Sequence, residues 1–127
     1  MRGVVVATKD ESTQHPIPNS WRPVLAKIVA AFAQGDYGLK VGVPGVEHVS
    51  SATEEQIRDF IHTYGATLVD LPEESWESSV CMWYGTYWDA FVDLWTKEEG
   101  RSDLVLSARV TEVSDGISIK LHMVYVP

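Results

Sequence analysis

The last fifty residues constrain the fold of this chain most, because they alternate like strands and contain two turn sequences. Residues 84–87 (YGTY) place Gly at the first central position of a two-residue loop, as a type II′ hairpin requires. Residues 114–117 (SDGI) contain the Asp-Gly pair of a type I′ turn, in which both central residues need a positive φ. The pattern predicts four consecutive antiparallel strands within residues 76–126.

The first turn sets the register of the first hairpin, because a two-residue loop fixes which residues stand opposite each other. It pairs Val80 with Phe91 and predicts that Trp76 lies opposite Trp95 on the same two strands.

The second turn gathers the apolar side chains of the last two strands on one face. It pairs Val110 with Leu121, and a slip of one residue would move the apolar set to the opposite face. The predicted apolar face consists of Leu104, Leu106, Ala108, Val110, Ile117, Ile119, Leu121, Met123 and Tyr125.

Two amphipathic helices are predicted ahead of these strands. The first begins near Asn19 or Ser20 and ends at Gly35, with apolar side chains at helical spacing between them. The second begins with overlapping capping boxes at residues 51–56 and ends at Gly65.

Shorter extended segments are expected at residues 39–43 and 66–71, with the second halted by Pro72. The helices provide the cover that the apolar sheet face needs, so the sequence predicts an α+β fold. We expect helices packed on a curved antiparallel sheet of four or more strands, in one domain over 1–127, with 8–19 a surface arm or loop.

The charge balance limits the classes of partner. There are 18 acidic and 10 basic side chains, a net charge of −8, and no basic stripe, which argues against nucleic acid. An acidic surface either suits a basic protein partner or simply maintains solubility. Cys81 is the single cysteine, and no apolar run is long enough for a secretory leader or a membrane span. We expect a cytoplasmic protein.

The strand predicted at residues 87–96 is apolar on both sides, which is typical of a central strand covered on both faces. Its odd positions also carry two carboxylates, Asp89 and Asp93, between aromatic residues. In a structural interpretation, Arg101, Arg109 or backbone N–H groups satisfy them. In a functional interpretation, they orient a ligand in a concave pocket.

The charged connection after this strand is either a solvated hairpin loop or an acidic recognition edge with an aromatic anchor. On the second interpretation Trp95 is the anchor. The candidate binding residues are therefore Asp89, Asp93, Trp95, Glu98, Glu99, Arg101 and Asp103.

No motif points to catalysis, a metal or a cofactor. The four histidines are scattered without metal-ligand spacing, and Cys81 fits a small buried hydrophobe better than a nucleophile. No phosphate loop or nucleophile elbow is present in the sequence. We expect no cofactor and no metal, and a non-catalytic role is favoured.

Two resemblances add to these predictions. Residues 28–37 (IVAAFAQGDY) resemble the opening helix of the nuclear-transport-factor-2-like superfamily, which implies a cone-like fold without any particular activity. Residues 92–96 (VDLWT), 98–104 (EEGRSDL) and 124–127 (VYVP) resemble a family of small uncharacterised bacterial proteins, over about 19–127. That family implies no particular activity. By analogy with other small acidic bacterial proteins, the chain is expected to be an immunity protein that neutralises a toxin.

The leading hypothesis is thus a non-catalytic protein-binding domain, in its finer form a toxin-neutralising immunity protein with a basic protein partner. The alternative is a small-ligand-binding protein or an isomerase-like or hydrolase-like enzyme with an internal cone pocket. In that case Asp89 or Asp93 acts as base or orienting group. A subunit that only forms homodimers through its sheet is a third alternative.

Overall fold

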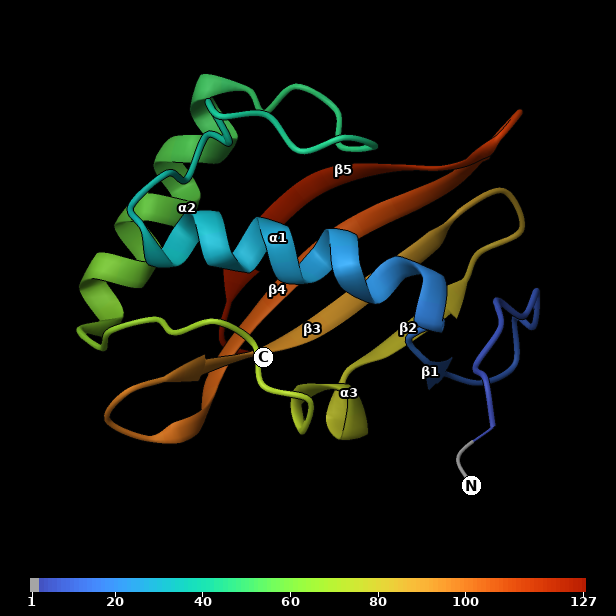
Figure 1. The fold of residues 1–127 in the computed structure, drawn as a ribbon, viewed down its shortest axis with the longest axis horizontal. Coiled ribbons are helices and arrows are strands. Elements are labelled where there is room, and N and C mark those ends of the chain that lie inside the picture. Colours follow the sequence, from blue (N-terminus) through green and yellow to red (C-terminus); the bar gives the residue numbers. More distant parts are fainter. Residues whose placement is uncertain (1–2) are drawn as a thin grey trace.

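A computed structural model describes residues 3–127, and it has the predicted α+β architecture. A five-stranded antiparallel sheet in the order β1-β2-β3-β4-β5 lies behind the helices in Figure 1. The sheet is curled but not closed. Its strands are β1 (His15–Pro16), β2 (Val80–Trp83), β3 (Trp88–Thr96), β4 (Gly100–Val113) and β5 (Gly116–Tyr125).

The two long helices cover one face of this sheet. A 3₁₀ turn (Asn19–Trp21) leads into α1 (Arg22–Ala33), which runs across the strands in Figure 1, and α2 (Ser51–Tyr64) packs against β5. A single-turn helix, α3 (Ser75–Ser78), lies against β3 and β1.

The ends of both long helices lie where glycine was predicted to end them, whereas the start of α2 differs from the prediction by one residue. Gly35 and Gly65 both have a φ of 85°, so the predicted glycine terminations of α1 and α2 are confirmed. The cap of α2 is Ser50, whose hydroxyl accepts a hydrogen bond from Thr53 N. The predicted capping boxes therefore begin one residue too late.

The two short extended segments are not strands. In the first, Leu39 has a φ of 52° and the Asp36 carboxylate accepts hydrogen bonds from Lys40 N and Val41 N, so the chain turns. The second pairs with the sheet through one isolated bridge, between Leu68 and Thr96. The first prediction was wrong because alternation of a few residues cannot outweigh local turn chemistry. The second segment does lie along β3, since Val69 N donates to Trp95 O and Lys97 N donates to Thr67 O, but one bridge is too short to make it a strand.

The core lies between the helices and the sheet. All the even positions of β3 are buried there, and Trp88 meets Trp21 of the 3₁₀ turn edge to face, with ring centroids 5.2 Å apart. Its indole N–H donates to Thr8 O at 3.0 Å, which brings the N-terminal arm over this end of the sheet. The largest fully buried side chains are Trp21, Trp88, Phe32, Ile17, Leu25, Ile28, Ile57, Leu94, Leu104, Leu106, Ile119 and Val29.

The first hairpin has the predicted register near its turn, where Val80 pairs with Phe91 and Gly85 has a φ of 91°. The pairing of Trp76 with Trp95 was wrong, because Trp76 belongs to α3 rather than to a strand.

Opposite Asp93, side chains of α3 and of the residue after it replace the strand as hydrogen-bond partners of β3. Ser75 Oγ donates to Asp93 O at 2.8 Å, and Ser79 Oγ accepts from Asp93 N at 2.9 Å. These two hydroxyls satisfy the backbone groups that a longer β2 would otherwise pair.

The second hairpin is shifted by two residues from the predicted register. Val113 pairs with Gly116 and Val110 with Ile119, so the loop consists of Ser114 and Asp115. Neither loop residue has a positive φ, which rules out the predicted type I′ geometry. A shift of two residues keeps every side chain on its predicted face, because the strand period is two.

An irregularity in the pairing of β4 with β5 then reverses which side chains of β5 point to the core near the end of that strand. Ala108 pairs with Leu121 but Ser107 pairs with Met123, so His122 is an extra residue. Beyond it, Val124 is the buried side chain, and Met123 and Tyr125 lie on the opposite face. Their predicted place in the apolar core face was wrong for this reason.

Candidate binding site

The sheet has a second face that neither α1 nor α2 covers. On β3 the odd positions point away from α1 and α2 and remain half-buried, whereas every even position is buried. We call this the outer face. It consists of Val80, Met82, Tyr87, Asp89, Phe91, Asp93, Trp95, Arg101, Asp103, Val105, Ser107, Arg109, Lys120, Met123 and Tyr125.

Apolar side chains cross the outer face in adjacent rows. Strand pairing places Val80, Phe91, Ser107 and Met123 in one row, from β2 to β5. The next row runs from Asp93 through Val105 to Tyr125. The sequence pattern indicated that β3 is apolar on both sides, and the structure shows that only one of those sides lies under helices.

The charges on the outer face are partly paired. Arg109 Nε lies 3.7 Å from Asp89 Oδ1, and its guanidinium lies 3.7 Å from the ring centroid of Tyr87. Asp89 therefore has Arg109 as a partner, one of the two arginines that the structural interpretation named.

The same interpretation of Asp93 was wrong. A β-bulge between Asp93 and Trp95 sets Arg101 opposite Trp95, while Asp93 stands opposite Val105. In the described residues the Asp93 carboxylate has no cation within 4 Å.

The two glutamates of the β3–β4 loop face α2 rather than a free edge. Glu98 accepts hydrogen bonds from the N–H and the hydroxyl of Thr67, and these lower the pKa of its carboxyl. Glu99 accepts from Tyr64 OH at 2.8 Å and from Thr96 Oγ1 at 3.1 Å. These contacts hold the loop against the C-terminal end of α2.

A pocket of about 420 Å³ opens at the Trp95 end of the outer face. We call it the Trp95 pocket, and its lining residues are Glu74, Glu77, Ser78, Trp95 and Arg101.

Two polar atoms in the walls of the Trp95 pocket lack partners. Ser78 Oγ and Trp95 Nε1 are both buried without a hydrogen bond. An unsatisfied buried group of this kind costs about 1–3 kcal/mol. The pocket therefore joins two of the predicted binding residues, Trp95 and Arg101, with unsatisfied hydrogen-bonding capacity.

The structure thus divides the predicted site. Trp95 and Arg101 line the pocket, Asp89 and Asp93 lie on the open sheet face, and the exposed Asp103 is on the adjacent strand. The acidic wall of the pocket, Glu74 and Glu77, was missed because α3 was taken for a strand. Proline followed by two glutamates and a serine at residues 72–75 is a helix-start signal that could have revealed it.

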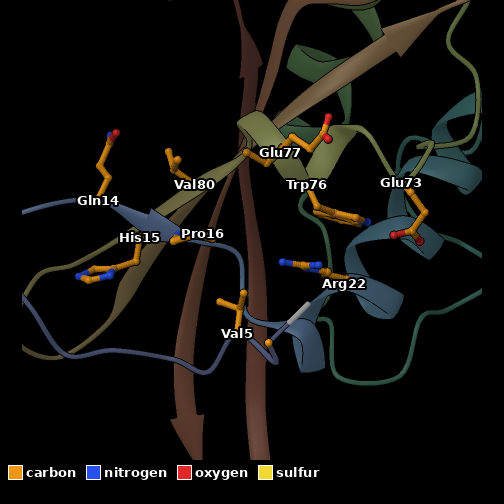
Figure 2. A pocket seen from close by; sticks show the side chains of 11 residues that line it. Val5, Gln14, His15, Pro16, Arg22, Glu73, Trp76, Glu77 and Val80 are labelled. Carbon is orange, nitrogen blue, oxygen red and sulfur yellow. The ribbon is translucent and has the colours of Figure 1, made fainter. Parts of the chain in front are cut away.

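A second pocket of about 410 Å³ lies on the other side of α3, between the N-terminal arm and the start of α1 (Figure 2). Arg22 donates two hydrogen bonds to Ile17 O, and its guanidinium lies 5.6 Å from the centroid of the Trp76 ring. His15, at the rim, is bonded to Asp10 at 2.9 Å. The basic side chains that line this pocket already have protein partners.

Some further chemical features bear on the class of site. Within residues 3–127, no group of three His, Cys, Asp or Glu side chains is placed to hold a metal ion. Burial raises the pKa of the Cys81 thiol to about 11, so the group is protonated at neutral pH. None of the helices in the described part of the chain has both the length and the apolar character needed to cross a bilayer.

Fold and site define an α+β domain whose antiparallel sheet carries helices on one face and an open, aromatic second face. The chain belongs to the family described as Domain of unknown function (DUF7668), whose model matches residues 29–127. No curated protein matches the chain, and no solved structure does. The resemblance to the nuclear-transport-factor-2-like superfamily therefore stays a prediction.

Proposed function

We propose that this domain is a non-catalytic protein-binding module whose partner docks on the outer face. The single observation that supports this most is the pair of largely apolar rows that cross four strands on the sheet face left uncovered by α1 and α2. Phe91 stands at their centre and stays half-buried. Contiguous apolar surface of this kind marks interaction sites in soluble proteins, and aromatic side chains dominate binding hot spots.

The chemistry of the partner follows from charge. The chain carries a net charge of −8, and the Asp93 carboxylate on the outer face has no cation within 4 Å among the described residues. A partner with a basic contact surface associates faster with a chain of this net charge and pairs the Asp93 carboxylate.

The alternative role, with Asp89 or Asp93 in an internal cone pocket, finds no support in the geometry. Both side chains point away from the helices, so a cavity between helices and sheet would not contain them. That space is filled by buried side chains of α1, α2 and the sheet.

The test is recovery of a partner with matched variants. Tagged wild-type protein is used to capture its partner from the source cell, and Phe91→Ala and Met123→Ala are compared with it. Each variant should reduce recovery about tenfold, the loss expected when a hot-spot contact worth about 1.4 kcal/mol is removed. Val41→Ala is the control, because Val41 is 81% exposed in the loop that follows α1. No stoichiometric partner, or variants that bind like the wild type, would refute the proposal.

The finer form of the proposal is an immunity protein, supported by the small acidic chain and the analogy with small acidic bacterial proteins. It requires that the captured partner arrests growth when expressed alone. Co-expression of this domain should restore growth, and co-expression of the Phe91→Ala variant should not. A partner without toxicity would leave the binding role intact and exclude the immunity role.

A further inference from the structure

We infer that the Trp95 pocket receives an arginine side chain of the basic partner. This inference rests on the proposed function, since the pocket lies at one end of the outer face. It goes further, because it assigns a specific chemical group to a specific cavity.

The walls of the pocket favour a cation. Glu74 and Glu77 are exposed acids on one face of the entrance, and in the described residues neither carboxylate has a hydrogen bond or an ion pair. Asp93 and Asp103 add negative charge on the neighbouring part of the outer face. The nearby cations are Arg101, in the pocket, and Arg22, which lines the second pocket together with Glu77 and already bonds to Ile17 O. The charge is therefore negative around a pocket large enough for one long side chain.

The aromatic wall favours a guanidinium over an ammonium. Trp95 is half-buried, so part of its ring remains accessible from the pocket. A planar guanidinium can stack on an indole and still direct its N–H groups to two carboxylates, whereas an ammonium is a compact and strongly hydrated charge.

The two unpartnered atoms fit the same ligand. A guanidinium can donate to Ser78 Oγ, and a main-chain carbonyl next to the arginine can accept from Trp95 Nε1. Both residues line the pocket, but both atoms are buried in the free domain, so these bonds require a side-chain movement on binding. Binding then satisfies groups that are unsatisfied in the free domain.

The experiment is an NMR titration of the full ¹⁵N-labelled chain with Nα-acetyl-arginine N-methylamide. The indole N–H signal of Trp95 is assigned by its loss in Trp95→Phe. We expect this signal to shift and saturate at millimolar ligand, while the citrulline analogue, which lacks the charge, binds at least fivefold more weakly. Glu74→Gln and Glu77→Gln should each weaken binding at least threefold.

The chain provides a matched control in Glu73→Gln. This residue is an exposed acid one position before Glu74, and it lines the other pocket but not this one. Its variant should bind the arginine compound like the wild type. A Trp95 signal that does not move, equal binding of the citrulline analogue, or an equal effect of Glu73→Gln would each overturn the inference.

The outcome is independent of partner capture. A captured partner that depends on Phe91, together with no arginine binding, would refute the pocket assignment and leave the proposed function standing. Saturable arginine binding without any captured partner would support the pocket assignment and refute the proposed function.

Discussion

Removing the Gln56 side chain should destabilise the domain and open an edge of its sheet. Gln56, on α2, reaches the end of β5. Its amide nitrogen donates to Val124 O at 2.7 Å, and its amide oxygen accepts from Val124 N at 3.1 Å. The side chain thus bonds to β5 as a neighbouring strand would.

Gln56 does not seal this edge alone. Farther along β5, the two backbone groups of Ile119 bond to Gly45 O and Glu47 N, each at 2.8 Å. Protected edges of this kind prevent pairing between chains. A homodimer that pairs strands through the β5 edge would therefore have to displace these contacts.

The magnitude of Gln56→Ala follows from two hydrogen bonds. Each is worth about 0.5–1.5 kcal/mol net, so the free energy of unfolding should fall by about 1–3 kcal/mol. With a slope of about 4 °C per kcal/mol for a domain of this size, the melting temperature should fall by about 4–12 °C. Urea unfolding and calorimetry measure the two quantities, and light scattering reports any association through the opened edge.

Glu55→Ala provides the matched control, because it is an exposed neighbour on the same helix. Its stability should stay within about 0.5 kcal/mol of the wild type. A Gln56→Ala variant no less stable than the Glu55→Ala variant would refute the role assigned to these hydrogen bonds.

Three further predictions concern the arm and the core. Hydrogen bonds, above all from the Ser12 hydroxyl, lower the pKa of Asp10 to about 2, so the stability that its carboxylate contributes is present above pH 3.8 and is lost as the pH falls towards 2. The difference in stability between the wild type and Asp10→Asn, measured by urea titration, should therefore shrink over that range. A difference that grows would contradict this prediction. Trp88→Phe removes the bond to Thr8 O and should speed tryptic cleavage after Lys9 several-fold, as followed by mass spectrometry; unchanged cleavage would exclude this anchor. Leu106→Ala should cost about 2–5 kcal/mol in chemical unfolding, and less than 1 kcal/mol would mean that the site is poorly packed.

Much of the fold could be predicted because its signals are local. Glycine at 35 and 65 ends both long helices, and the turn at Gly85 sets the first hairpin register. The alternation along residues 87–96 identified a central strand with two apolar sides. In each case the deciding interaction lies within a few residues along the chain.

The errors came from interactions between distant residues. Two serine hydroxyls bond the backbone of Asp93 and replace a strand with α3, and an extra residue at His122 turns Tyr125 to the outer face. Neither contact has a local signature, although Pro72 and the two glutamates after it do signal the start of α3. A bulge also decided that Arg101 stands opposite Trp95 instead of pairing with Asp93.

The sequence by itself determined the fold class, the net negative charge of the chain and the aromatic residues and carboxylates of the strand that carries the candidate surface. Only the tertiary structure decided which side of β3 is covered, that Glu98 and Glu99 bind to the end of α2, and that α3 places two acids beside Trp95. The physical reason is that periodicity reports which side chains share a face, whereas packing of distant segments decides which face meets water.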